Sequence, residues 1–555
     1  MKAEQENTRQ PELSRQVLVT GGSFESLAAA CEIADLGFPV LLSYQKEPPF
    51  SSPAADLAAK NGGKKTIDDI RKRARKAGGK IRMLPGTEIR ALSGAPGDFT
   101  VTVGRGADTE TLRVGAVVLA SDLCDRPLTE AYGISGSQAV LSQAALEAAL
   151  ENPAASPALK DGRKITALFL LGFLQKGTPI VLSRVLSEIE ALQKARSGNA
   201  DVYVVAGDLK LAADGLDRLY AESRRNGAIF FKLESAPEIT QTESAVTLHV
   251  YDQALRETLA ICPDLLVVED ALAPSPENEA LAAALRLDLD ASGFLQKENV
   301  HLGPVLSNRE GVFVVGPARA LCDLSGGLLD AKNAALSVAA LFSGEASANV
   351  ARVDADKCTI CLTCFRVCPH GAISWNGTAQ ISPLACRGCG LCASECPMEA
   401  IQVGGYEDEA ISRKLSEAPA GEAAGPRITA FVCKNSAAEA LGAAKAFRLP
   451  LPKNLSAVVV PCAGKVDADS ILEALVNGAD GVMVVSCHMG NCKSEKGNLY
   501  ASWRVSDVKR RLSDIGLAPE RVSFTTLAAN MASGFSRAAL EMETALKGLA
   551  GEKAQ

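Results

Sequence analysis

Apolar residues recur along the chain in short runs separated by helical patterns, and one such unit lies close to the N-terminus. Residues 16–47 read QVLVTGGSFESLAAACEIADLGFPVLLSYQKE, which predicts a strand, a tight turn, an alanine-rich helix and a second strand. Strands that alternate with helices indicate a parallel sheet, whose functional groups gather beyond the carboxyl ends of the strands. The pattern therefore predicts a dinucleotide-binding βαβ unit.

The same alternation returns in the last quarter of the chain, where three apolar runs each end near a cysteine. The predicted strands are 428–432, 457–460 and 481–485, and a helical pattern covers 468–476. The cysteines at the strand ends are Cys433, Cys462 and Cys487, followed by Cys492. Because parallel strands end at one edge of a sheet, we expect the four thiols to converge as a metal site. Buried packing cysteines are the alternative.

Two blocks between these regions share the spacing C-x2-C-x2-C-x3-C-P. Their thiols are Cys358, Cys361, Cys364 and Cys368 in the first block, and Cys386, Cys389, Cys392 and Cys396 in the second. This spacing is typical of two-cluster ferredoxins, in which the fourth cysteine of each block ligates the other [4Fe-4S] cluster. We therefore assign Cys396 to the cluster of the first block and Cys368 to that of the second. A zinc module is the alternative, since C-x2-C pairs also suit tetrahedral zinc.

Composition narrows the class of protein. A chain of 555 residues with 47% hydrophobic residues predicts two to four folded domains, and a net charge of −7 argues against nucleic-acid binding. The N-terminal residues are polar, and the longest apolar run, residues 165–174, is about half a membrane span. We expect a soluble, cytoplasmic protein without a membrane span, in which metal or redox chemistry accounts for most of the 16 cysteines and disulfide bonds do not. Four of them are expected to be packing thiols: Cys31, Cys124, Cys262 and Cys322.

The N-terminal βαβ unit departs from the dinucleotide fingerprint G-x-G-x-x-G. Its three glycine positions read Gly21, Ser23 and Ser26, and Tyr44 stands where an acidic residue should contact the ribose. The second glycine lets the backbone approach the pyrophosphate, and the third allows close packing of helix and strand. We expect the fold to persist with a weak or empty nucleotide site.

The C-terminal segment, residues 428–549, resembles the delta subunit of the methyl-viologen-reducing hydrogenase. The resemblance rests on ITAFVC, VVVPCAGKVDADSILEALVNGADGVMVVSCHMGNC and GNLYASWRV. It implies one [2Fe-2S] cluster held by the four C-terminal cysteines. The family usually has further cysteines where this chain has Val432 and Ser436.

The N-terminal half resembles the A subunit of heterodisulfide reductase, which is a flavoprotein with inserted ferredoxin clusters. The matching stretches are the opening unit, AVVLAS, VLSRVLSEIEALQKARSGNADVYVVAGDLK and REGVFVVGPARALCDLSGGLLDAKNAALSVAALFSG. The resemblance implies a degenerate FAD site at Gly21, Gly22, Gly316 and Asp323. FAD binding is therefore doubtful.

A chain with these three parts resembles the B subunit of the quinone-interacting membrane-bound oxidoreductase of anaerobes. The resemblance implies an electron-transfer subunit of an oxidoreductase complex that relays single electrons and has no catalytic residues of its own. Its partners would be heterodisulfide-reductase-like or quinone-interacting oxidoreductase subunits, one of which could tie it to the cytoplasmic face of a membrane. Two alternatives stay open: a flavin-containing oxidoreductase or electron-bifurcating subunit, and a structural adaptor with non-reducible clusters.

The expected architecture is α/β overall. It comprises a polar tail (1–15), a two-dinucleotide-binding Rossmann-like domain (16–345), an α+β ferredoxin domain with two [4Fe-4S] clusters (346–406), a linker (407–427) and a C-terminal α/β parallel-sheet iron–sulfur domain (428–549).

Overall fold

The computed structural model describes most of the chain. The described residues are 13–45, 50, 53–59, 63–137, 139–152, 159, 163–175, 178–196, 199–207, 209, 215–242, 245–253, 255–296, 303–343, 349–417 and 425–552. Most of the predicted polar tail (1–12) and part of the predicted linker (418–424) lie outside them.

The first unit is a five-stranded parallel sheet of order β18-β7-β1-β2-β3, covered by helices. Its central strands are buried on both faces, which explains their nearly continuous apolar sequences. An antiparallel meander of β4, β5 and β6 extends from it. The elements are β1 (Val17–Thr20), α1 (Phe24–Asp35), β2 (Val40–Tyr44), α2 (Pro53–Ala58), α3 (Lys64–Lys76), β3 (Ile81–Pro85), β4 (Glu88–Ala95), β5 (Asp98–Arg105), β6 (Asp108–Val114), β7 (Ala116–Leu119), α8 (Glu277–Leu285), β18 (Val312–Val314) and α9 (Leu324–Ser343).

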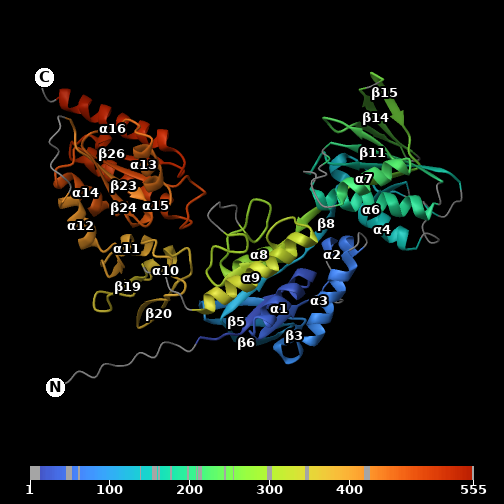
Figure 1. Ribbon diagram of the computed structural model, residues 1–555, viewed down its shortest axis with the longest axis horizontal. Helices are drawn as coiled ribbons and strands as arrows, with labels where there is room; N and C mark the ends of the chain where they lie inside the picture. The colour runs from blue at the N-terminus through green and yellow to red at the C-terminus, as the bar shows by residue number, and fades with distance from the viewer. Residues whose placement is uncertain are drawn as a thin grey trace.

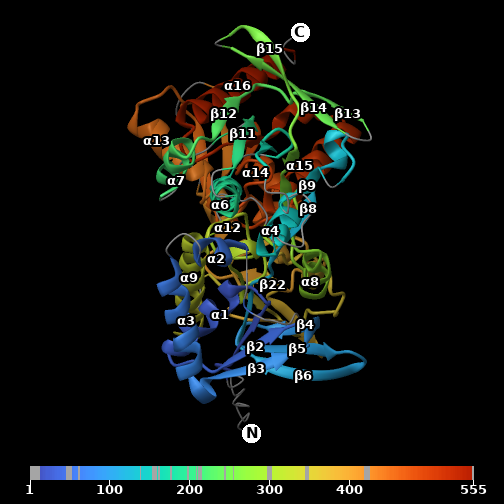
Figure 2. The ribbon, with the colours of Figure 1, turned by 90° about the vertical axis from the view of Figure 1, so that its right-hand side faces the viewer.

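A second parallel sheet, of order β12-β11-β10-β16-β9, is inserted between β8 and β17, which pair antiparallel. The meander β13–β15 projects from this unit (Figure 2). Two such sheets confirm the predicted two-dinucleotide-binding fold. The elements are β8 (Leu123–Pro127), β9 (Val140–Ser142), α4 (Gln143–Glu151), β10 (Ile165–Leu171), α6 (Pro179–Ala195), β11 (Ala200–Ala206), α7 (Leu216–Arg225), β12 (Ile229–Lys232), β13 (Glu238–Gln241), β14 (Val246–Asp252), β15 (Glu257–Ile261), β16 (Leu265–Val268) and β17 (Asp270–Pro274).

The ferredoxin domain consists of two short antiparallel pairs, β19 with β22 and β20 with β21, and two helices of one turn. The helices carry the third cysteine of each block, and the first two cysteines lie in the loops before them. Its elements are β19 (Ala351–Val353), α10 (Thr363–Val367), β20 (Ile373–Asn376), β21 (Thr378–Ile381), α11 (Leu391–Ser394) and β22 (Ile401–Val403).

The C-terminal domain is a four-stranded parallel sheet of order β24-β23-β25-β26 with an apolar core on each face. The three predicted strands and the predicted helix 468–476 are all present. The elements are β23 (Ile428–Cys433), α13 (Ala437–Ala446), β24 (Leu455–Val460), α14 (Ala468–Val476), β25 (Gly481–Ser486), α15 (Gly497–Asp514), β26 (Val522–Thr526) and α16 (Ala532–Glu552).

The predicted linker is in part a helix, which corrects the sequence interpretation. Helix α12 (Asp408–Ser416) buries Ile411 and Leu415 in the core of the C-terminal domain. The Ala, Gly, Glu and Pro residues that follow suggested a linker throughout, whereas this apolar pair at i and i+4 was enough to anchor a helix.

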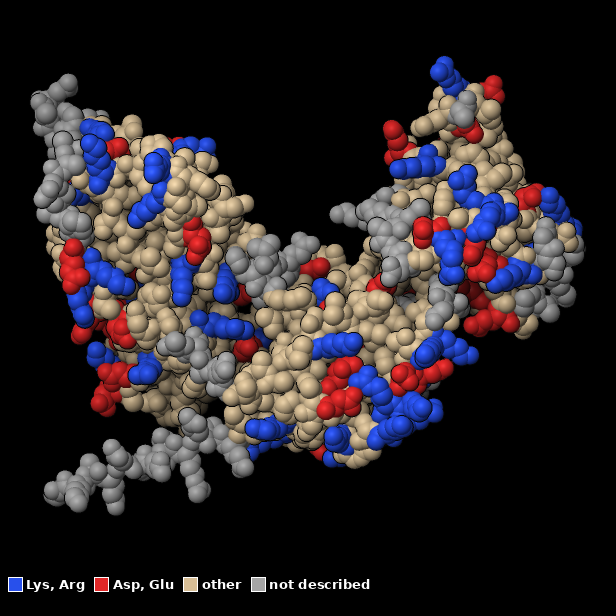
Figure 3. All heavy atoms as spheres, in the orientation of Figure 1, with Lys and Arg blue, Asp and Glu red and all other residues tan. Residues whose placement is uncertain are grey.

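The domains follow one another across the molecule, with the ferredoxin domain between the first unit and the C-terminal domain (Figure 1). Acidic and basic side chains are interspersed over the visible face (Figure 3). Within the described ranges, none of the helices combines the length and apolar character needed to cross a membrane.

Candidate metal centres

The structure gathers the cysteines of the ferredoxin domain into two sets that exchange their fourth members. One cavity is lined by Cys358, Cys361, Cys364 and Cys396. Burial raises the pKa of Cys364, and the three other thiols of this cavity add to the effect because a second nearby negative charge is unfavourable. The first three thiols of block one therefore share a site with the last thiol of block two.

The second set lies deeper in the molecule. Burial raises the pKa of Cys389 to about 12, and the neighbouring thiols of Cys368 and Cys386 add to the shift. Burial likewise raises the pKa of Cys392, next to the same neighbours. Backbone amides of Ala351 and Gly388 donate to the sulfur of Cys386 at 3.3 and 3.4 Å. Without a metal these buried thiols stay protonated, so metal binding here would release protons.

The four C-terminal cysteines converge at the carboxyl edge of the parallel sheet, as expected from the strand pattern. The sulfurs of Cys433 and Cys487 are 3.8 Å apart, and those of Cys462 and Cys492 are also 3.8 Å apart. All four side chains are buried. Hydrogen bonds from the thiols of Cys433 and Cys492 lower the pKa of Cys487. The set is thus poised to hold at least one thiolate, the form that ligates metals.

The N-terminus of α15 completes this site. A Cβ atom on Gly497 would lie 2.3 Å from the sulfur of Cys462, so only glycine allows the helix to begin against the thiols. The side chain of Asn498 donates to the carbonyl oxygens of Cys487 and His488 at 3.1 and 2.8 Å. The positive end of the helix dipole favours negative charge on the sulfurs.

The remaining thiols lie away from these sets, with one difference from expectation. Cys31 is buried and Cys124 and Cys322 are partly buried, but Cys262 is exposed next to Thr247 and does not pack in a core. Across the described ranges, no three His, Cys, Asp or Glu side chains are placed around a common point to hold a single metal ion.

The second ferredoxin set and the C-terminal set contribute thiols to one buried cluster. Cys389, Cys462 and Cys492 belong to one buried cluster with Leu391, against which Val367 and Tyr500 are packed. The charge of Cys492 also raises the pKa of Cys389, after burial and its nearer thiol neighbours.

Polar contacts hold this junction together. Arg504 donates to Glu395 at 2.6 and 2.9 Å and to the carbonyl oxygens of Gly464 and Val466. The hydroxyl of Ser394 donates to the Gly464 carbonyl at 2.6 Å. These contacts join α11, which carries Cys392, to the 3-10 turn η5 (Ala463–Lys465) that follows Cys462.

Lys465 is fully buried at the same junction. Its side chain packs against Gly390, where a Cβ atom would lie 2.7 Å from the Lys465 Cβ. Its ammonium group donates to Asp408 at 2.6 Å, and Asp467 lies 3.9 Å away. Burial alone would raise the pKa of Asp408, but hydrogen bonds from Lys465 and Gln402 lower it. Sequence reasoning missed Lys465, Arg504 and Gly497, because no periodic pattern marks a lone polar or glycine residue.

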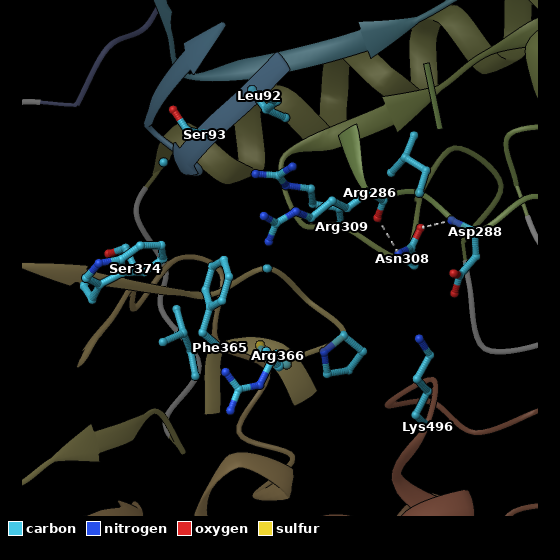
Figure 4. A pocket seen from close by; sticks show the side chains of 17 residues that line it. Leu92, Ser93, Arg286, Asp288, Asn308, Arg309, Phe365, Arg366, Ser374 and Lys496 are labelled. Carbon is cyan, nitrogen blue, oxygen red and sulfur yellow. Dashed lines mark hydrogen bonds between the residues drawn. The ribbon is translucent and has the colours of Figure 1, made fainter. Parts of the chain in front are cut away.

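A cavity of about 700 Å³ separates the ferredoxin domain from the first unit, and Cys368 lies on its wall. Figure 4 shows Arg286 and Arg309 together on one side and Lys496 extending into the cavity from the C-terminal domain. The Arg286 guanidinium lies 4.8 Å from the ring centre of Phe365, a cation–π contact across the boundary. Burial, and then the charge of Arg286, lower the pKa of Arg309 to about 10.

The predicted flavin residues are divided between two places. Gly21, Gly22 and Tyr44 line a cavity of about 470 Å³, whose lining includes neither Gly316 nor Asp323. A Cβ atom on Gly21 would lie 2.0 Å from the carbonyl oxygen of Ala120, so this glycine is required by the packing of the turn itself. The four residues that the resemblance implies for FAD binding therefore do not line one described cavity together, and as placed they do not fit the cofactor.

Separate regions of the chain match different known proteins. Residues 428–550 match the family model of the methyl-viologen-reducing hydrogenase delta subunit. Residues 351–374 and 379–402 each match a 4Fe-4S binding domain, which indicates two [4Fe-4S] clusters. The chain is 28% identical over 353 residues to the A subunit of the ferredoxin:CoB-CoM heterodisulfide reductase of Methanosarcina mazei, which covers 63% of this chain and 44% of that protein. The chain thus spans less than half the length of this relative.

Among solved structures, the thioredoxin reductase of T. acidophilum superposes with a TM-score of 0.40 and 14% identity, covering 59% of this chain and 99% of that one. The iron-sulfur D subunit of the F(420)-non-reducing hydrogenase of Archaeoglobus profundus is 33% identical over 124 residues, which are 22% of this chain and 90% of that protein. The vhu D subunit of Methanocaldococcus jannaschii is 37% identical over 117 residues, covering 21% and 87%. Through its C-terminal domain the chain therefore belongs to the methyl-viologen-reducing hydrogenase delta-subunit family, joined here to a region similar to the A subunit of heterodisulfide reductase.

Proposed function

We propose that the chain is an iron–sulfur electron-transfer subunit of a multi-subunit, heterodisulfide-reductase-like oxidoreductase complex. It relays single electrons through two [4Fe-4S] clusters and one [2Fe-2S] cluster. The observation that carries this proposal is that Cys389, Cys462 and Cys492 share one buried cluster, since electron tunnelling between cofactors falls steeply with distance. A third cluster at this place would add one more electron-transfer step next to the second ferredoxin cluster.

The twelve clustered cysteines supply the ligands in three sets of four. Cys358, Cys361, Cys364 and Cys396 hold the first [4Fe-4S] cluster, Cys386, Cys389, Cys392 and Cys368 hold the second, and Cys433, Cys462, Cys487 and Cys492 hold the [2Fe-2S] cluster. The shared lining of the first cavity and the thiol neighbours of Cys389 support this crossed assignment.

The proteins that bind this chain in the proposed complex would be subunits related to those that assemble with its relatives. Subunits of heterodisulfide-reductase-like or quinone-interacting oxidoreductases would exchange electrons with the first [4Fe-4S] cluster and with the [2Fe-2S] cluster. Within the complex the protein would pass single electrons between its clusters without a flavin, because Gly21 and Tyr44 line a cavity whose lining includes neither Gly316 nor Asp323.

The metal content tests the ligand sets. The protein purified without oxygen should contain about ten iron atoms per chain, four in each cubane and two in the third cluster. Zinc in place of iron would contradict the proposal at its base. Clusters that accept no electron over the accessible range of potentials would instead favour a structural adaptor.

Paramagnetic resonance tests the junction. The reduced second and third clusters should broaden each other's spectra, because cysteines of both sets share one buried cluster. Cys487→Ser should remove the third signal and sharpen that of the second cluster, whereas Cys262→Ser, which alters an exposed thiol, is the matched control and should change neither. Independent, unbroadened signals in the wild-type protein would refute the relay across this junction.

A further inference from the structure

The N-terminus of α1 satisfies its own hydrogen-bonding groups. The hydroxyl of Ser23 accepts from the backbone amide of Ser26 at 3.3 Å and donates to the carbonyl of Ala120 at 2.9 Å. The hydroxyl of Ser26 donates to the Ser23 carbonyl at 2.7 Å. In a dinucleotide-binding unit, this helix end offers its amides to the pyrophosphate. Here the Ser23 side chain already accepts a hydrogen bond from one of these amides, that of Ser26.

Glu25 lies in this first turn of α1 and is fully buried. Its side chain fills the space beside two glycines of the opposite segment. A Cβ atom on Gly316 would lie 2.8 Å from the Glu25 Cγ, and one on Gly327 would lie 2.6 Å from the same atom. Gly327 belongs to the first turn of α9, which packs along α1 (Figure 1). The carboxylate thus lies between the N-terminal ends of two helices.

Two helix N-termini with glycines between them would attract an anion, and the chain supplies one of its own. We propose that the Glu25 carboxylate occupies the position that a dinucleotide pyrophosphate would need, so that this fold excludes FAD. Its side chain fills the space beside Gly316 and Gly327, while Gly21 and Tyr44 line a separate described cavity.

The exclusion predicts which substitutions open the site. Restoring the fingerprint alone, with Ser23→Gly, Ser26→Gly and Tyr44→Glu, should leave FAD binding weak, because the Glu25 side chain still fills the space that the pyrophosphate would need. Adding Glu25→Ala should lower the FAD dissociation constant by at least about tenfold relative to that triple variant. Titration of the full-length, iron-loaded protein with FAD, followed by quenching of flavin fluorescence, measures this change. A quadruple variant with Glu25→Gln, which keeps the volume, should bind FAD no better than the triple variant.

Three results would overturn the inference. The first is wild-type protein isolated with one tightly bound FAD, which acid extraction reveals without any variant. The second is a quadruple Glu25→Ala variant with unchanged circular dichroism and iron content that binds FAD no more tightly than the triple variant. The third is equal FAD affinity with Ala and Gln at this position, because occupancy by the side chain would then not matter. Cluster content and cluster signals report on the proposed relay separately, so either hypothesis can fail alone.

Discussion

The buried ammonium of Lys465 provides a sharp test of the junction between the ferredoxin and C-terminal domains. Its side chain has no exposed surface, and Asp408 on α12 accepts its hydrogen bond at 2.6 Å. The substitution Asp408→Asn keeps the shape and a neutral acceptor but removes the compensating charge. A buried cation without its partner is unfavourable, so the segment around Lys465 should open more often.

The structure sets the size of this effect. Removing one partner of a fully buried ion pair costs about 3–5 kcal/mol. The Asp408 side chain is 44% exposed and Asp467 remains 3.9 Å from the ammonium, so the expected cost is smaller, about 2 kcal/mol. That free energy corresponds to an increase of about thirtyfold in the population of the locally open state.

Hydrogen–deuterium exchange of α12 and of residues 462–466 measures this opening in the intact, cluster-loaded protein. Amides of both segments should exchange about thirtyfold faster in Asp408→Asn, whereas those of the distant helix α7 should not change. The matched background is Lys465→Met, which keeps an unbranched side chain against Gly390 without a charge. There, Asp408→Asn should change exchange by less than about threefold. Equal effects in both backgrounds would refute the view that the two charges interact.

Other substitutions test the metal sites and one buried acid. Cys368→Ser should damage the cluster signal of the second block and spare that of the first, as crossed ligation requires; paramagnetic spectra distinguish the two. Gly497→Ala should abolish the third signal alone, because its Cβ atom would lie 2.3 Å from the Cys462 sulfur; retention of that signal at full intensity would contradict the site. Burial raises the pKa of Glu188 in α6, so the folded state retains a proton that the unfolded state releases as the pH rises above about 4.3. Stability should therefore fall by up to about 1.4 kcal/mol per pH unit between that value and about pH 8, where the folded carboxyl group also ionises because its pKa is raised to about 8. Thermal denaturation of Glu188→Gln should show less of this loss.

Elements made of apolar runs could be predicted from sequence because burial dictates their pattern. Strands β23, β24 and β25 are nearly continuous apolar segments, and their common direction alone places Cys433, Cys462 and Cys487 at one edge. The fourth member, Cys492, arrives through a loop and could be predicted only because it closely follows β25. Most of the predicted metal-site residues could therefore be identified from the regular cysteine spacing and from the common direction of the strands.

Contacts between distant polar residues could not be predicted in this way. Arg504 meets Glu395 across 109 positions of sequence, and Lys465 meets Asp408 across 57. The role of Glu25 could not be predicted, because the dinucleotide fingerprint is defined by its glycines. The proposed exclusion of FAD depends on a residue that lies between those positions. In each case the local sequence is that of an ordinary helix or turn. The role of the residue depends on which side chain it contacts in the folded protein.

The joining of a delta-subunit domain to the ferredoxin domain changes what holds the junction together. In the hydrogenase relatives that match this domain alone, the equivalent domain is a separate chain, so any such contact must offset the loss of translational and rotational freedom. Here α12 anchors the connection in the C-terminal core, and docking of the two domains becomes intramolecular at a high effective concentration. A few contacts, such as Arg504 with Glu395 and Ser394 with Gly464, then suffice to keep Cys389 and Cys462 in one buried cluster. The spacing of the two proposed clusters is thus set by contacts within one chain and does not depend on the concentration of a partner.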